Sequence, residues 1–268
     1  MTHAISTHKR CLAWAGATLA ALVAVSSLRA ATLDEIRQRG FLIVATQDNM
    51  PPFEYATARG VIGYDNELLI GLREASGLKI HHEVTSLCDV VAGVASGKYD
   101  VAVTALVARP GDESIAFSAP VAESSLAYLA RRDNASIHQA GDLHGRTVGV
   151  QKCAGLTQDA SAQVAANTGA RPGNVVEFAS VASAYQELVA GRIDAVVGTR
   201  ASLGQIARET SGLFEIGPLA KTNVQIVWAV RKGNDALLDL LNDYIGRLRG
   251  TGALARLQFK YDLLGNGT

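Results

Sequence analysis

The sequence predicts an α/β fold that is divided into two lobes. Short apolar runs alternate with amphipathic helical segments, and this alternation occurs in two separate series along the chain. At roughly 150 residues per domain, the 268 residues suffice for one large domain or two small ones. With 48% hydrophobic and 19% charged residues, the chain can bury an apolar core and does not have the composition of a disordered protein.

The first 30 residues have the features of a secretory signal peptide. Lys9 and Arg10 form a short basic region, residues 11–26 carry no charge, and Ala30 offers a small residue for cleavage. A membrane anchor is the alternative, but this charge-free stretch is short for a span. Cleavage after Ala30 would leave 22 basic and 25 acidic residues. We therefore expect a soluble mature protein in the periplasm.

The first series of elements follows this segment. Residues 41–46 form an apolar run that predicts a buried strand. Residues 66–75 place Leu68, Leu69 and Leu72 on one helical face, and Gly77 ends that helix. A strand at 79–84, a short helix at 90–95 and a strand at 100–105 complete the series. The order β-α-β-α-β predicts a mostly parallel sheet.

A second series begins after residue 134. Its predicted elements are a strand at 146–151, a helix at 157–166, a strand at 174–178, a helix starting at Ser180 and a strand at 194–198. Residues 235–248 predict a final helix. Two extended segments, 125–132 and 224–231, could cross between the lobes, although one continuous sheet is an alternative.

Seven short motifs in this order resemble the family 3 extracellular solute-binding proteins, the receptors of ABC importers for polar amino acids. The resemblance covers about residues 32–263. The motifs are FLIVATQDNMPPFEY (41–55), GYDNEL (63–68), SGKYD (96–100), IAFS (115–118), DLHGRTVGVQ (142–151), AGRIDAVV (190–197) and AVRKGN (229–234).

The resemblance implies a type II periplasmic binding protein fold with two crossover strands and a cleft between the lobes. The expected segments are a signal peptide at 1–30, lobe 1 at 31–127 and 224–268, and lobe 2 at 128–223. It also implies a monomer that captures a small-molecule solute and docks on a membrane permease, without a cofactor or metal. Zero net charge and the lack of basic runs argue against a nucleic-acid partner.

Ligands of open α/β sheets bind beyond the carboxyl ends of the strands, which are here at Gln47, Thr104, Gln151 and Thr199. From this rule and the resemblance, the candidate ligand-binding residues are Gln47, Met50, Phe53, Leu87, Thr104, Leu106, Arg109, Thr157 and Thr199. Three of them have a structural alternative. Phe53 could pack within its lobe, Arg109 could be an exposed loop residue, and Thr157 could cap a helix.

Several positions depart from the pattern of the family. Its carboxylate-binding Arg falls at Gly111 or Asp112, although Arg109 could substitute for it. Its ammonium-binding Asp is replaced by Thr199. Met50 and Leu87 stand where the family has aromatic residues. Because a charge without a partner in a closed cleft is costly, we expect an amino-acid-like solute that is not a standard α-amino acid.

Cys88 and Cys153 are the two cysteines of the expected mature chain, and the resemblance places both beside the cleft. A bridge between them would lock the lobes together, so free thiols on different sides are the expectation. A metal site with His81 and His82 is disfavoured, because adjacent residues of a strand point to opposite faces.

An enzyme on the same scaffold is the alternative function. The resemblance extends to periplasmic cyclohexadienyl dehydratases, which use a carboxylic general acid. In this chain Gln158 stands where the acid would lie, and Asp159 is next to it. We therefore expect a receptor that catalyses no reaction.

Overall fold

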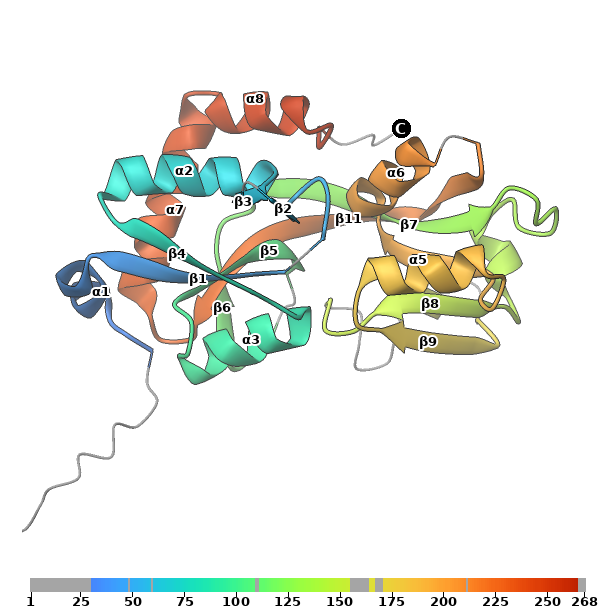
Figure 1. Ribbon diagram of the computed structural model, residues 1–268, viewed down its shortest axis with the longest axis horizontal. Helices are drawn as coiled ribbons and strands as arrows, with labels where there is room; N and C mark the ends of the chain where they lie inside the picture. The colour runs from blue at the N-terminus through green and yellow to red at the C-terminus, as the bar shows by residue number, and fades with distance from the viewer. Residues whose placement is uncertain are drawn as a thin grey trace, which may run out of the picture.

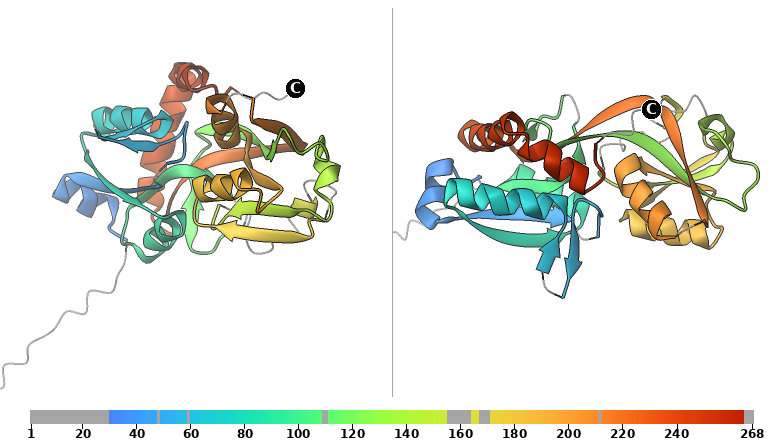
Figure 2. Two further views of the ribbon diagram at one scale, coloured as in Figure 1. Left: turned by 45° about the vertical axis from the view of Figure 1, so that its right-hand side comes forward. Right: turned by 90° about the horizontal axis from the view of Figure 1, so that it is seen from above.

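The computed structural model describes residues 30–47, 49–58, 60–108, 111–154, 164–166, 171–210 and 212–264, except for the side chains of 56 and 220–222. Two lobes lie side by side (Figure 1). Two long strands, β7 (Ala122–Arg131) and β11 (Phe214–Arg231), run from one lobe into the other, as the views in Figure 2 also show. The predicted two-lobed fold with two crossover strands is confirmed.

Lobe 1 contains the N-terminal half of the described chain and its C-terminal helices. Its strands are β1 (Phe41–Gln47), β4 (Lys79–Thr85), β5 (Val101–Val107) and β6 (Ile115–Phe117), with a separate hairpin of β2 (Tyr55–Thr57) and β3 (Gly60–Ile62). Its helices are α1 (Leu33–Arg39), α2 (Tyr64–Ser76), α3 (Leu87–Ser96), α7 (Asp235–Gly250) and α8 (Ala253–Lys260). Strand β1 pairs in parallel with both β4 and β5, as the β-α-β-α-β order predicts.

Lobe 2 repeats this arrangement, with fewer elements among the residues that the structure describes. It contains η1 (Ala140–Leu143), β8 (Thr147–Gln151), β9 (Asn174–Phe178), α5 (Val181–Val189), β10 (Ala195–Thr199) and α6 (Arg200–Glu209). Strand β8 pairs in parallel with β9 and β10. Of the predicted helix at 157–166, only residues 164–166 lie within the described chain, and they are helical.

The crossing strands connect the parallel sheets of the two lobes. The strand order is β4-β1-β5-β11-β7-β10-β8-β9, with β6 also paired to β11. The pairs β11–β5, β11–β7 and β10–β7 are antiparallel. Backbone hydrogen bonding thus continues without a break through one curled sheet. The helices, in contrast, form two separate groups, one on each lobe. The predicted lobe bounds fall within β7 and β11 and remain predictions.

Local sequence signals explain where the helices next to the cleft begin. Ser86 caps α3 by accepting a hydrogen bond from the Asp89 backbone N–H. Thr199 caps α6 in the same way, through the Ser202 N–H. Ser86 directly follows β4 and Thr199 is the last residue of β10, so both strands turn into helices at the edge of the sheet that faces the other lobe.

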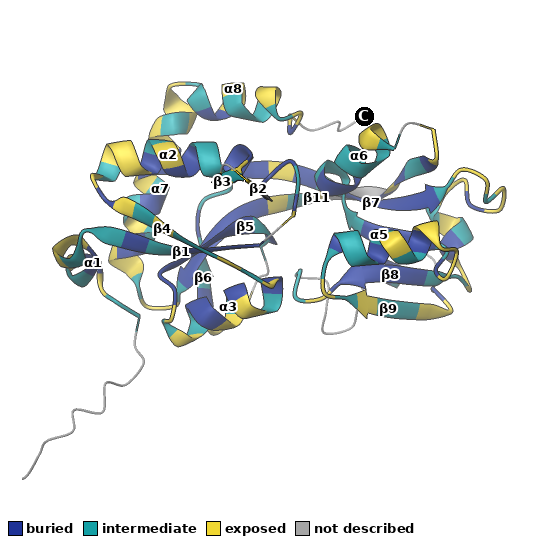
Figure 3. Cartoon of the chain, in the orientation of Figure 1, coloured by how far each residue is buried: buried dark blue, intermediate teal, exposed yellow. Residues whose placement is uncertain are grey.

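The buried residues concentrate on the strands, whereas the outer faces of the helices are exposed (Figure 3). Trp228 of β11 and Tyr128 of β7 are fully buried, so the crossing strands are part of the core. Within the described part of the chain, no helix combines the length and apolar character needed to cross a membrane.

Candidate functional site

A small cavity lies between the lobes, at the carboxyl ends of β5, β8 and β10. Its volume is about 30 Å³, which is room for only one or two water molecules. Lobe 1 contributes Met50, Ala105 and Val107. The other lining residues are Leu126, Gln151, Ala154, Val181, Val197, Gly198, Thr199 and Ser202. The lobes therefore lie close together around a space that both of them line.

The polar groups of this cavity are neutral, since none of the described lining residues is charged. Thr199 Oγ1 lies 3.1 Å from Ser202 Oγ, to which it donates a hydrogen bond. Ser202 Oγ in turn donates to Met50 Sδ across the cleft, at 3.3 Å. These three side chains form a short hydrogen-bonded chain from lobe 2 to lobe 1.

Gln151 supplies the remaining polar group. Its side chain is only 3% exposed, and Nε2 donates a long hydrogen bond of 3.4 Å to the Ala179 carbonyl. Oε1 has no hydrogen-bond partner among the residues that the structure describes. A buried acceptor without a partner costs about 1–3 kcal/mol, which a bound molecule with an N–H or O–H group would recover.

A disulfide between Cys88 and Cys153 connects the lobes at the edge of the cleft. The expectation of free thiols on different sides is therefore wrong. Cys88 lies at the start of α3, and Cys153 follows β8 by two residues. Their Cα atoms are 5.3 Å apart, within the range of about 4.4–6.8 Å that a disulfide spans. The family resemblance places both near the cleft, but the sequence cannot give this distance.

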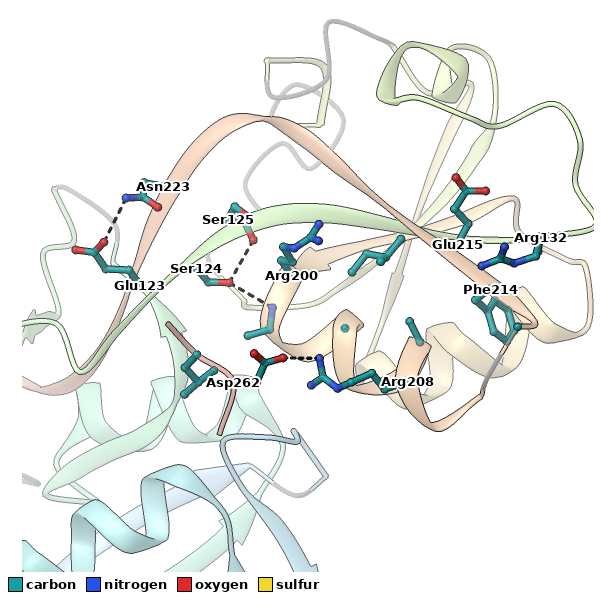
Figure 4. A pocket seen from close by; sticks show the side chains of 16 residues that line it. Glu123, Ser124, Ser125, Arg132, Arg200, Arg208, Phe214, Glu215, Asn223 and Asp262 are labelled. Carbon is teal, nitrogen blue, oxygen red and sulfur yellow. Dashed lines mark hydrogen bonds and ion pairs between the residues drawn. The ribbon is translucent and has the colours of Figure 1, made fainter. Parts of the chain in front are cut away.

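A wider hollow of about 380 Å³ lies along the crossing strands (Figure 4). Arg208 of α6 makes an ion pair there with Asp262, which follows α8, at 2.9 Å. The backbone N–H of Ala201 donates to Ser124 Oγ of β7 at 3.3 Å. Arginine and acidic side chains both line this hollow, so it has no net preference for one sign of charge.

Comparison with known proteins identifies the family. Residues 42–264 match the bacterial extracellular solute-binding proteins, family 3. The chain belongs to this family. We therefore compare the chain with individual members of this family.

Individual relatives agree with this assignment. The chain is 27% identical to the L-cystine-binding protein TcyJ of Escherichia coli over 253 residues, which are 92% of this chain and 93% of the relative. It is similar to the structure of an ancestral arginine-binding protein bound to arginine, with a TM-score of 0.74, 27% identity and coverage of 83% and 98%. A receptor for L-cysteine of Neisseria gonorrhoeae gives a TM-score of 0.75, 27% identity and coverage of 86% and 93%.

Two of the predicted ligand-binding residues, Met50 and Thr199, line the cavity between the lobes. They come from different lobes, and Ser202 connects them. The structure thus brings these two residues together at the edge of the sheet that the strand-end rule indicates. Whether they contact a solute remains a prediction.

Five other predicted residues are buried but do not line this cavity. They are Gln47 at the end of β1, Phe53, Leu87, Thr104 and Leu106. Phe53 packs edge-on against Tyr64 with ring centroids 6.1 Å apart, and Leu87 and Leu106 belong to one apolar cluster of lobe 1. The Gln47 amide and Thr104 Oγ1 have no hydrogen-bond partner within the described chain. Their ligand contacts stay predictions.

Arg109 and Thr157 lie outside the described residues, as do Gln158 and Asp159. Gly111 and Asp112, where the family has its Arg, are described. Asp112 accepts hydrogen bonds from the Ser114 and Ile115 backbone N–H groups. This carboxylate therefore orders its own loop.

Two polar residues of the cavity were not among the candidates. Gln151 is the last residue of β8, so its position at a strand end is a signal for it. Ser202 lies on the first turn of α6, three residues after its cap Thr199. Only the strand-to-helix turn at this position brings Ser202 into the cavity, and the sequence pattern did not single it out.

Proposed function

We propose that this protein is the periplasmic solute-binding receptor of an ABC importer, and that it traps one small solute between its lobes. The observation that carries the proposal is the space lined by both lobes, where the lining residue Gln151 has a buried Oε1 with no partner among the described residues. Because the present cavity has room for only one or two water molecules, the lobes would move apart to admit a solute and then close around it. A solute that contacts both lobes binds the closed state better than an open one, so it shifts the population toward closure. Membership of the solute-binding family supports the same function.

For the solute, we propose an amino-acid-like molecule that is not a standard α-amino acid. The described cavity lining has hydroxyl, amide and apolar groups but no charge, and Thr199 offers a neutral oxygen. Such a lining suits a solute with a neutral hydrogen-bond donor for Gln151 Oε1 better than a solute that carries both a free ammonium and a free carboxylate. The names of similar proteins specify L-cystine, arginine and L-cysteine, so these three are the competing candidates.

The remaining parts of the proposal concern location and partners. The segment 1–30 would direct export and be removed, and the closed monomer would dock on a membrane permease. The protein would catalyse no reaction, and its specificity would depend on the groups that surround the cavity. Arg109 would supply the cation if the solute has a carboxylate.

A thermal-shift panel tests this function. It contains the standard amino acids, L-cystine, opines, carboxylates and betaines, and each α-amino acid is paired with the corresponding acid that lacks the amine. A solute at one hundred times its dissociation constant adds about 2.7 kcal/mol to the free energy of unfolding. For a protein of this size that is about 5–11 °C in melting temperature.

The expected result is a shift by one class of solute, with the tightest member outside the standard amino acids. A standard α-amino acid as the tightest ligand would refute the proposed solute class and leave the receptor function standing. No shift from any solute of the panel, either with the Cys88–Cys153 disulfide intact or after its reduction, would count against the receptor function itself.

A further inference from the structure

The Cys88–Cys153 disulfide joins elements that belong to different lobes. Cys88 is the second residue of α3 in lobe 1, and Cys153 follows β8 in lobe 2. Neither lies on β7 or β11, so the bridge is a covalent connection in addition to the two crossing strands. We propose that this disulfide is a redox-controlled clamp, which keeps the lobes together until a small thiol reduces it. The effect of this clamp on the uptake and release of solute rests on the proposed function.

The position of the bridge determines what it does to a hinge. β7 and β11 are paired neighbours, so a rotation that opens the lobes would bend these two strands. In Figure 1 they pass above α3, which lies at the lower edge of lobe 1 beside lobe 2. A rotation about the strands must therefore separate Cys88 from Cys153.

The permitted separation is small. The Cα atoms are 5.3 Å apart, and a disulfide spans at most about 6.8 Å, so this edge of the cleft can widen by only about 1.5 Å. Opening of a cleft around a ligand requires larger movements of the domains. With the bridge intact, the lobes stay close even when no solute is bound.

Two polar contacts between the lobes are weaker than this bond. Met50 and Ser202 share a hydrogen bond to sulfur at 3.3 Å. The Arg208–Asp262 ion pair joins side chains that are 50% and 59% exposed, where solvent screens the attraction. Both can break and form again during opening. Among these described contacts, the disulfide is the covalent one and therefore limits how far the lobes can separate.

The surroundings of the two cysteines favour exchange with a thiol. Both residues are partly exposed, so a small thiol can reach the bridge. Cys88 lies in the first turn of the ten-residue helix α3, where the helix N-terminus stabilises a thiolate. Since the more stable thiolate leaves faster, attack is expected on Cys153 Sγ.

The reduction is a balanced thiol–disulfide exchange. A thiolate forms a bond to Cys153 Sγ, the bond between the two cysteines breaks, and the electron pair leaves on Cys88 Sγ. A second thiolate then attacks the mixed disulfide and releases Cys153 as a thiolate. Both protein thiolates take up the protons that the two small thiols have lost. Two thiols are oxidised to one disulfide, and the bridge is reduced to two thiols.

Small-angle X-ray scattering of the solute-free protein tests the clamp without any knowledge of the solute. The protein is purified without reductant and measured before and after treatment with dithiothreitol and alkylation of the free thiols. Peptide mass spectrometry reports the state of Cys88 and Cys153 in each sample, and circular dichroism checks that the reduced protein remains folded. The matched control is the double variant Cys88→Ser, Cys153→Ser, which lacks the bridge in both conditions.

We expect reduction to increase the radius of gyration of the wild-type protein and to leave that of the double variant unchanged. The untreated variant should already have the larger value. Equal scattering of the oxidised and reduced wild type, or free thiols in the untreated protein, would overturn the clamp. If scattering responds to reduction but no solute binds, the receptor function fails and the clamp stands.

Discussion

Trp228 Nε1 donates a 3.2 Å hydrogen bond to Asp65 Oδ1 in the interior of lobe 1. Trp228 belongs to the crossing strand β11 and Asp65 to the first turn of α2, and both are almost completely buried. Burial disfavours the charged carboxylate and raises the pKa of Asp65 to about 7, although the hydrogen bond from Trp228 opposes this shift.

This relationship predicts a pH-dependent effect of Asp65→Asn. In the wild type, the unfolded chain loses the Asp65 proton near pH 4, whereas the folded protein keeps it until about pH 7. The contribution of Asp65 to the free energy of unfolding therefore falls as the pH rises between these values. The variant keeps an acceptor for Trp228 and has no charge to bury. Its melting temperature should exceed that of the wild type by several degrees above pH 7, and the two should converge toward pH 4.

Asp243→Asn on the exposed face of α7 is the control for this comparison. The melting temperature of this variant should stay close to that of the wild type across the pH range tested. A difference between Asp65→Asn and the wild type that is the same at pH 4 and pH 8 would contradict the assignment to Asp65 ionisation.

The burial of Met50 predicts how the cleft responds when this side chain loses volume. The side chain is 6% exposed and contacts Ser202 of the other lobe. Met50→Ala should lower the free energy of unfolding by about 2–4 kcal/mol, because it leaves a cavity. Met50→Leu nearly conserves the volume and should cost less than about 1.5 kcal/mol. Urea unfolding measures both, and equal costs would show that volume at this position is not decisive.

The Arg208–Asp262 ion pair predicts a small effect. Because both side chains are about half exposed, Arg208→Gln should change the free energy of unfolding by no more than about 1 kcal/mol. The difference should shrink further at high salt. A loss of several kcal/mol in urea unfolding, independent of salt, would mean that this pair is a main support of the interface between the lobes.

The position of Gly217, where the crossing strands pair, predicts that a residue with a side chain does not fit there. A Cβ atom on Gly217 would overlap the Tyr128 side chain, which is fully buried. Gly217→Ala should therefore lower the free energy of unfolding by about 1–3 kcal/mol. Gly246→Ala is the control, since no atom lies near that Cβ in helix α7 and alanine should stabilise the helix by up to about 1 kcal/mol. Equal effects in thermal melts would contradict this account.

Much of the fold could be predicted from hydrophobic periodicity. The strand at 174–178 was predicted with its observed bounds, because its apolar run is flanked by polar residues. Strand β11 is much longer than the predicted 224–231, since it starts at Phe214 and passes Gly217 and Pro218, which do not have the composition of a strand. Helices α1, α6 and α8 are not predicted from the sequence. Each has few buried residues, so the apolar stripe that marks a helix is weak in all three.

The candidate site was predictable only as an edge of the sheet. The strand-end rule found the positions of Gln47, Gln151 and Thr199, whereas Thr104 lies within β5, which continues to Val107. Side chains alternate between faces, and their directions depend on the tertiary fold. Gln151 and Thr199 line the cavity and Gln47 does not. The sequence argument predicts free thiols, because a bridge between the lobes opposes opening. That argument concerns function, and only the distance between the cysteines could decide the pairing.

The most direct test of the central claim, one solute held between the lobes, is isothermal titration with the tightest solute of the panel, carried out after reduction of the Cys88–Cys153 disulfide. The wild type is compared with Gln151→Leu, which removes the buried acceptor, and with Gln186→Leu, the same change at an exposed position of α5. We predict one solute per chain and an affinity loss of about tenfold or more in Gln151→Leu, from a lost hydrogen bond of about 1.4 kcal/mol or more. Gln186→Leu should bind like the wild type. Unchanged affinity in Gln151→Leu would contradict a solute bound in this cavity.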